Sequence, residues 1–213
     1  MKREDSIRAD IIAVCQKIYQ NGFVAANDGN VSVKLSDNRI LVTPTGRSKG
    51  SLTQKELLVI DSKGRILKGN LKPTSELPLV LYTYQKRKDI KATVHAHPLY
   101  STSFSVAGIG LPKDVLPEIF LTLGEVPLAK YGTPSTVELA NSVSDYIKDH
   151  DAILLKNHGV LTLGKDVEEA YYKLERVEHF AHILWLAIGL GRVDRISKKD
   201  MDKLLKLRRN TGV

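Results

Sequence analysis

Apolar residues recur along this chain with two different periods, which predict helices near both ends and short strands between them. Apolar side chains lie at helical intervals over residues 5–21, so this segment is expected to form an amphipathic helix that stops at Gly22. The longest helical pattern covers residues 166–189, and a basic helix is expected over about 199–208.

The middle of the chain is typical of short strands joined by turns. Alternating or continuous apolar runs bounded by Gly, Asn and Asp predict strands. They occur in the segments NVSVKL, RILVTP, LLVID, RILKG, KATVHAH, VPLAKY, AILLKN and VLTLG. The turn SKG between LLVID and RILKG indicates a hairpin, in which neighbouring strands run antiparallel.

Further helices are expected between these strands. One starts at a cap formed by Thr74 or Ser75, and two others cover 99–108 and 133–148. Helices distributed among hairpin-linked strands predict an α/β fold. We expect one domain, 1–213, with a central, mainly antiparallel sheet and helices on both faces.

The composition narrows the choice of partner and compartment. The net charge is +8, but the basic residues are dispersed and are not interleaved with aromatic residues, which argues against a nucleic-acid-binding surface. No segment is long and apolar enough to span a membrane, and the first ten residues lack the apolar stretch of a signal peptide. Cys15 is the single cysteine, so an internal disulfide is excluded. We therefore expect a cytoplasmic protein without a nucleic-acid or membrane partner.

Three histidines form the strongest candidate for a chemical site. His95 and His97 lie two residues apart in a β-branched run, so both imidazoles would face the same side of a strand. His158 ends another apolar run and precedes Gly159, where the backbone could turn tightly. Burying adjacent imidazoles is costly unless something binds them. Three neutral imidazoles with one open position are the usual ligands of a catalytic zinc ion, so we expect a divalent metal site.

Two glutamates could complete this site. Glu76 lies in the first turn of a predicted helix, where its carboxylate could join the metal site or could only stabilise the helix dipole. Glu118 lies in an apolar stretch, and the alternatives are a buried acid with a shifted pKa and an exposed edge residue. The residues alone leave both pairs of alternatives open.

Three small polar clusters have the character of an anion-binding site. Each offers backbone amides and short side-chain donors, and one of them lies at a helix N-terminus. The residues are Asn27, Gly29 and Asn30, then Thr45 and Gly46, and then Thr74 and Ser75. Together with a metal site they indicate a small phosphorylated substrate. Nucleotide binding has no support, because the chain lacks a Walker-type motif and a G-x-G-x-x-G motif.

The same segments carry a resemblance to a known family. GNVSV, TPTG, PTSE, VHAHP and KNHG occur in this order, and the likeness covers nearly the whole chain. Together they resemble the class II aldolase/adducin-head family, particularly the branch of L-fuculose-phosphate aldolases and 5-deoxyribulose-1-phosphate aldolases. The resemblance implies reversible cleavage of a ketose 1-phosphate into dihydroxyacetone phosphate and an aldehyde. It also implies a class II aldolase-like α/β domain and a homotetramer with sites at subunit interfaces.

The resemblance also implies a role for each candidate residue. His95, His97 and His158 would bind a divalent ion, with Zn²⁺ expected and Mn²⁺ as the alternative, and Glu76 would be a further ligand and the catalytic acid/base. The three polar clusters would hold the substrate phosphate. Glu118 stands near the position of a tyrosine in fuculose aldolases, and we expect it to handle the proton at the C4 oxygen.

Departures from the family pattern keep other activities open. The C-terminal segment KLLKLRRNTGV lacks the tyrosine that fuculose aldolases have there, and Glu118 is reminiscent of methylthioribulose-1-phosphate dehydratases. A sugar-phosphate 4-epimerase is another alternative, although that branch has an aspartate where Glu76 stands. A non-catalytic, adducin-like binding module is the alternative from a different class, and the intact histidines and Glu76 argue against it.

Overall fold

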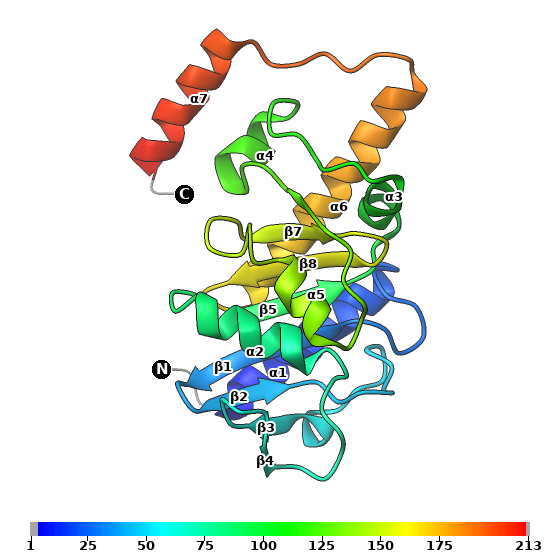
Figure 1. Ribbon diagram of the computed structural model, residues 1–213, viewed down its shortest axis with the longest axis vertical. Helices are drawn as coiled ribbons and strands as arrows, with labels where there is room; N and C mark the ends of the chain where they lie inside the picture. Colours follow the sequence, from blue (N-terminus) through cyan, green and yellow to red (C-terminus); the bar gives the residue numbers. More distant parts are fainter. Residues whose placement is uncertain (1–3, 212–213) are drawn as a thin grey trace.

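One eight-stranded sheet forms the centre of the protein in the computed structural model, which describes residues 4–211 (Figure 1). The strand order is β4–β3–β2–β1–β5–β8–β7–β6, and all neighbouring strands are antiparallel except β6 and β7. The strands are β1 (Asn30–Ser36), β2 (Arg39–Val42), β3 (Leu58–Ile60), β4 (Ile66–Lys68), β5 (Ala92–Ala96), β6 (Leu128–Ala129), β7 (Ala152–Leu155) and β8 (Gly159–Gly164). The expected domain bounds of 1–213 include residues 1–3 and 212–213, which lie outside the described residues.

Helices cover both faces of the sheet, so the predicted α/β architecture is confirmed. The helices are α1 (Glu4–Gln20), α2 (Leu77–Lys86), α3 (Leu99–Ala107), α4 (Pro117–Thr122), α5 (Val137–Ser142), α6 (Val167–Gly189) and α7 (Lys198–Thr211), with a short 3₁₀ helix at Gln54–Glu56. α1, α3, α4 and α6 pack on one face, and α2 and α5 pack on the other. Within residues 4–211, no helix has both the length and the apolarity that crossing a bilayer requires.

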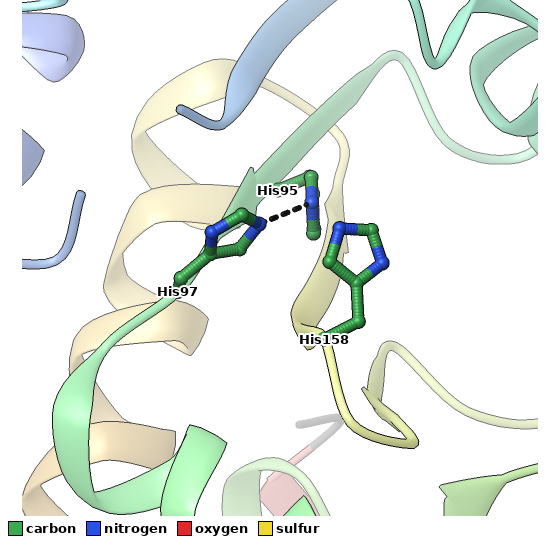
Figure 2. A group of neighbouring side chains, drawn as sticks. All are labelled: His95, His97 and His158. Carbon is green, nitrogen blue, oxygen red and sulfur yellow. Dashed lines mark hydrogen bonds between the residues drawn. The ribbon is translucent and has the colours of Figure 1, made fainter. Parts of the chain in front are cut away.

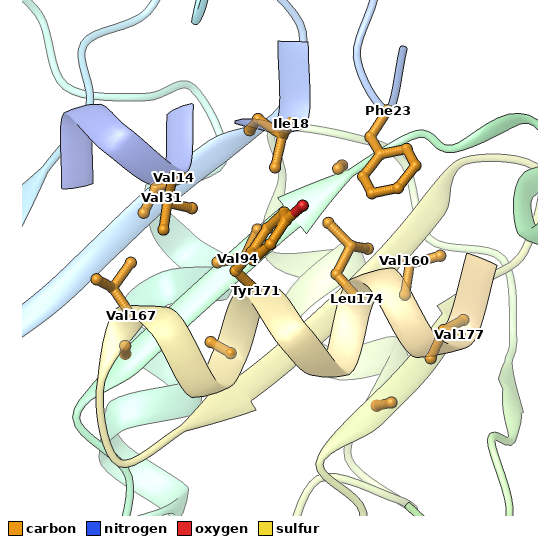
Figure 3. Packing of buried hydrophobic residues seen from close by; sticks show 14 of the residues in the cluster. Val14, Ile18, Phe23, Val31, Val94, Val160, Val167, Tyr171, Leu174 and Val177 are labelled. Atoms are coloured by element: carbon orange, nitrogen blue, oxygen red, sulfur yellow. The ribbon is translucent and has the colours of Figure 1, made fainter. Parts of the chain in front are cut away.

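The larger apolar layer holds α1 and α6 against the sheet (Figure 3). Ile18 of α1 packs with Tyr171 and Leu174 of α6 over Val31 and Val94 of the central strands. All five are nearly inaccessible to solvent, and complete burial of one aliphatic side chain of this size contributes about 1.5–3 kcal/mol. This layer fixes the central strands, and thus the register on which the candidate site depends.

The alternation of side chains along β5 places one candidate residue on the opposite face. Val94 and Ala96 belong to the layer beneath α6, so His95 between them points toward the side covered by α2 and α5. Asn30 of β1 and Leu161 of β8 are its cross-strand neighbours. β1 and β5 therefore bring the polar side chains of Asn30 and His95 together on the α2 side of the sheet.

The start of α2 differs from the expectation. The helix begins at Leu77 and Glu76 is its N-cap residue, so neither Thr74 nor Ser75 occupies the cap. Thr74 instead accepts a hydrogen bond at Oγ1 from the amide of Glu76, at 3.3 Å. The prediction that Thr74 or Ser75 caps the helix was wrong, because the N-cap residue is Glu76, whose side chain turns away from the helix toward His95 and His158.

Two other elements are shorter than expected. The helix expected over 133–148 is α-helical only in α5, and turns follow it up to residue 149. Ser142 Oγ donates to the carbonyl of Leu139 at 2.8 Å, and serine side chains that compete for the backbone in this way favour helix ends and turns. The strand expected in VPLAKY is reduced to β6, which lies at the sheet edge and pairs only with β7.

Candidate metal and phosphate site

The three histidines meet where β5 ends beside the turn between β7 and β8 (Figure 2). His95 lies in β5, His97 follows its last residue, and His158 lies in the turn. One ligand nitrogen of each lies within 4.8 Å of the others, and Nε2 of His95 is 3.0 Å from Nε2 of His97. Nitrogens that bind one zinc ion tetrahedrally at about 2.0–2.1 Å are roughly 3.3 Å apart, so this group is suited to a single cation.

Gly159 allows this convergence, but not for the reason expected from the sequence. The left-handed conformation in the turn belongs to Asn157, with φ of 56°, and not to Gly159. A Cβ atom on Gly159 would lie 2.4 Å from the carbonyl oxygen of Ala96 and 2.6 Å from Cδ2 of His97. Glycine is therefore required by the close approach of β8 to the end of β5.

Contacts outside the cluster orient the imidazoles. Nδ1 of His95 is 2.9 Å from the carbonyl oxygen of Val160 and must donate to it, because a carbonyl can only accept. In the neutral ring, which is the form that binds a metal ion, this leaves the lone pair of Nε2 facing the cluster. Nδ1 of His97 lies 3.5 Å from the carboxylate of Asp28, so its Nε2 is also directed inward.

The carboxylate of Glu76 points into the same cluster. Its Oε2 is 3.0 Å from Nε2 of His95 and accepts a hydrogen bond from Nδ2 of Asn30 at 2.9 Å. Its Oε1 is 3.1 Å from Nε2 of His158. Glu76 makes no side-chain capping bond to α2, so this orientation favours a role in the cluster over a role in helix stabilisation alone. Three imidazoles and one carboxylate are a donor set that fits a divalent cation.

Charges within the cluster shift its pKa values. Burial raises the pKa of Glu76, but the adjacent His95 and His158 outweigh burial and hold this pKa far below its usual range. Burial lowers the pKa of His95, and the charge of Glu76 reverses this and raises it overall. Burial and the charges of His95 and His158 lower the pKa of His97 to about 3. His97 is therefore neutral at pH 7, which is the form that binds metal ions.

Backbone hydrogen bonds connect two of the three predicted phosphate clusters, the one at Thr45 and Gly46 and the one at Thr74 and Ser75. The amide of Thr45 donates to the carbonyl of Lys72 at 3.0 Å, and the amide of Thr74 donates to the carbonyl of Thr43 at 3.1 Å. These bonds place the loop that carries Gly46 beside the loop that precedes α2. Thr45, Gly46 and Ser75 are exposed.

The remaining phosphate cluster lies directly beside the histidines. Asn30 pairs with His95 across β1 and β5, and its side-chain amide is bonded to Glu76. Gly29 has φ of 73°, and a Cβ atom there would meet the carbonyl oxygen of His95 at 2.7 Å. Asn27, two residues earlier, is exposed. The structure thus brings the three clusters and the histidines into one region, and their binding roles remain a prediction.

Glu118 is separated from this group within one chain. It lies in the first turn of α4 and is exposed, which is the second of the two alternatives stated for it. Within residues 4–211, Glu118 makes no hydrogen bond or ion pair with the histidines. Its assignment as the acid at the C4 oxygen therefore remains a prediction.

Lys49 lies near the site, and the sequence did not indicate this. Its side chain is only 1% exposed, and its ammonium donates to the carbonyls of Asn27 at 2.9 Å and Arg47 at 3.1 Å. Burial lowers the pKa of Lys49. A lysine among Gly and Ser residues is typical of a solvated loop, so no local pattern could have shown that this one is buried.

The fold and the site together define an α/β protein with a three-histidine, one-carboxylate cluster at the end of a central strand of a mainly antiparallel sheet. The family described as class II aldolase and adducin N-terminal domain matches residues 9–185, and the chain belongs to this family.

Similar proteins agree with this family membership. L-fuculose phosphate aldolase from Methanococcus maripaludis is 41% identical over 181 residues, which cover 85% of this chain and 97% of that protein. The 3-oxo-tetronate 4-phosphate decarboxylase of Haemophilus influenzae is 33% identical over 183 residues, which cover 84% of this chain and 87% of that protein. A solved L-fuculose 1-phosphate aldolase superposes with a TM-score of 0.89 at 28% identity, over 98% of each chain. L-fuculose-1-phosphate aldolase from Thermus thermophilus superposes with a TM-score of 0.77 at 27% identity, over 89% of this chain and 98% of that one.

Proposed function

We propose that the protein is a metal-dependent aldolase that cleaves a ketose 1-phosphate, of the L-fuculose 1-phosphate or 5-deoxyribulose 1-phosphate type, into dihydroxyacetone phosphate and an aldehyde. The observation that carries this proposal is the convergence of three histidines with the Glu76 carboxylate. The similarity to proteins named L-fuculose phosphate aldolase supports the choice of reaction.

Each residue has a distinct task in this mechanism. His95, His97 and His158 would hold the divalent ion, Zn²⁺ or Mn²⁺, which when bound is a Lewis acid that stabilises negative charge next to the substrate carbonyl. Glu76 lies against His95 and His158 and would hold the proton exchanged at C3 when the C3–C4 bond breaks. The loops around Gly29, Thr45 and Ser75 would bind the phosphate and fix the position of the substrate, which contributes orientation and not bond chemistry.

Glu118 and the assembly are linked in this proposal. Because Glu118 is exposed and does not contact the cluster of its own chain, it would act on the C4 oxygen only at the site of another subunit. We therefore propose a homotetramer with sites at subunit interfaces. Large exposed apolar side chains on α3 and after α6 support an assembly, among them Leu99 at 72% exposure and Leu190 at 87%. A monomer in size-exclusion chromatography with light scattering would contradict it.

The test is release of dihydroxyacetone phosphate from a panel of ketose 1-phosphates, followed by NADH oxidation with a coupled glycerol-3-phosphate dehydrogenase. Glu76→Gln should fold normally and lose at least about 100-fold in turnover, the usual contribution of a positioned acid/base. Glu125→Gln, which changes an exposed carboxylate elsewhere, is the control and should retain wild-type turnover. The proposal is wrong if the metal-loaded wild type releases no dihydroxyacetone phosphate from any member of the panel.

The similarity to a 3-oxo-tetronate 4-phosphate decarboxylase supports a second candidate function, decarboxylation of a phosphorylated sugar acid at the same site. Carbon dioxide release from 3-oxo-tetronate 4-phosphate distinguishes it from aldol cleavage. A dehydratase or a 4-epimerase would release neither carbon dioxide nor dihydroxyacetone phosphate, so the two assays together separate aldol cleavage and decarboxylation from each other and from these two activities.

A further inference from the structure

Lys49 is a buried cation to which the proposed mechanism gives no task. It is among the largest side chains with less than 2% exposure in the described part of the chain. Burial of an ammonium group is costly unless strong polar contacts compensate for the lost hydration. A methionine would fill similar space without this cost, so the contacts of the charge itself must account for the lysine at this position.

The ammonium of Lys49 joins two separate loops. It donates to the carbonyl of Asn27, in the loop before β1, and to the carbonyl of Arg47, in the loop after β2. Gly29 lies two residues beyond the first contact, and Gly46 precedes the second directly. The two loops tied together by Lys49 are thus two of the loops proposed to hold the substrate phosphate.

The first of these loops has a demanding backbone conformation. Ala26 has φ of 46° although it carries a side chain, and Gly29 has φ of 73°. Residues in this region persist only where surrounding contacts hold them. The hydrogen bond from Lys49 to the carbonyl of Asn27 acts on the residue that follows Ala26, so it is positioned to hold this conformation.

The charges around Lys49 connect it to the rest of the site. Burial has the largest effect on the pKa of Lys49 and lowers it, while Cys15, Asp28 and Glu76 act in the opposite direction. Conversely, the positive charge of Lys49 opposes the overall rise in the pKa of His95 and adds to the lowering of the pKa of His97. The ammonium therefore lies close enough to the cluster to add positive potential where an anionic substrate would bind.

We propose that Lys49 is a positioning residue for the substrate phosphate. By drawing the carbonyls of Asn27 and Arg47 inward, it holds both loops at a fixed separation, which keeps the polar groups of Gly29 and Gly46 available to one phosphate ester. This inference rests on the proposed function, because it concerns the phosphate end of the same site. Loss of the ammonium should weaken recognition of the phosphate and leave metal binding unchanged.

Three variants test this role in the full-length, metal-loaded protein. Lys49→Met removes the charge and keeps the length of the side chain, Lys49→Gln keeps neutral donors, and Lys55→Met removes an exposed lysine from the same region as a control for net charge. Lys49→Met should raise KM for a ketose 1-phosphate by about tenfold, equivalent to ~1.4 kcal/mol, and leave kcat within about threefold. The unphosphorylated ketose should be cleaved with an unchanged kcat/KM. Lys49→Gln should be intermediate, and Lys55→Met should match the wild type.

Binding of inorganic phosphate, measured by calorimetry on the same proteins, separates this inference from the proposed reaction. If the wild type binds phosphate and Lys49→Met binds it about tenfold more weakly with full metal content, the inference holds even when no ketose phosphate is cleaved. It is overturned if Lys49→Met binds phosphate like the wild type, or if it impairs phosphorylated and unphosphorylated ketoses equally. Should Lys49→Met not fold, the same comparisons with Lys49→Gln decide the question.

Discussion

Replacement of Gly159 by alanine tests the packing that brings the histidines together. The new Cβ atom would lie 2.4 Å from the carbonyl oxygen of Ala96 and 2.6 Å from Cδ2 of His97, whereas ordinary contacts begin at 3.4 Å. The strands β5 and β8 must therefore separate by about 1 Å at this point, because a backbone oxygen in a sheet cannot rotate away. Overpacking of this kind costs about 1–3 kcal/mol.

The expected result is a lower melting temperature together with weaker metal binding. A protein of this size loses roughly 2–4 °C for each kcal/mol, so a cost of ~2 kcal/mol should lower Tm by about 4–8 °C in differential scanning calorimetry. The apparent Kd for Zn²⁺, measured by competition with a chelator, should rise, because the added methyl group pushes against His97.

Gly189→Ala is the matched control for Gly159→Ala. Gly189 lies in α6, and a Cβ atom there would have nothing within 4 Å. Gly189 is the last residue of α6, where the preference for alanine is smaller than the roughly 0.5–1 kcal/mol of a helix interior, so this variant should melt close to the wild-type temperature. Equal melting temperatures for the wild type and both variants would refute the close approach at Gly159.

Two further predictions concern acid stability and metal binding. Burial raises the pKa of Asp151, but hydrogen bonds from Lys173 at 2.8 Å and Arg87 at 2.7 Å outweigh it and lower this pKa overall. The folded-state pKa is below the unfolded value of about 3.9, so the contribution of this carboxylate is present above about pH 4 and is lost as pH falls further. In Asp151→Asn, the urea midpoint of unfolding should therefore fall less steeply as the pH is lowered below about 4. If the fall is as steep as in the wild type, Asp151 is not its cause. Zn²⁺ at about 100 times its Kd should stabilise the wild type by about 2.7 kcal/mol in thermal melts, and His95→Ala should remove most of this shift. An equal shift in both proteins would mean that zinc binds elsewhere.

Most helices and strands could be predicted from the sequence because their patterns depend on residues a few positions apart. α1 and α6 match their expected ranges closely, and β5 lies within the segment expected to carry two histidines. The start of α2 was predicted wrongly because it depends on distant groups. The carboxylate of Glu76 turns toward His95 and His158, and helix-capping rules cannot anticipate such partners.

In the candidate site, too, the features that depend on near neighbours were predicted and those that depend on distant contacts were not. The residue types by themselves indicated a metal ion, and the spacing of His95 and His97 placed both imidazoles on one side of a strand, because strand side chains alternate with a period of two. The role of Gly159 was misjudged from the sequence. A sharp turn and a close contact with a neighbouring strand both call for glycine, and only the structure shows which of the two applies.

The sequence alone therefore determined the α/β class, the periods of the main elements and the chemical character of the candidate metal ligands. Only the tertiary structure decided that Glu76 and His158 meet His95 and His97, that Lys49 is buried and bonded to the loop before β1, and that Glu118 is exposed. The physical reason is that periodicity records interactions between near neighbours along the chain. Contacts between distant segments, and the burial of a charge among them, depend on how the strands pair and which helices cover the sheet.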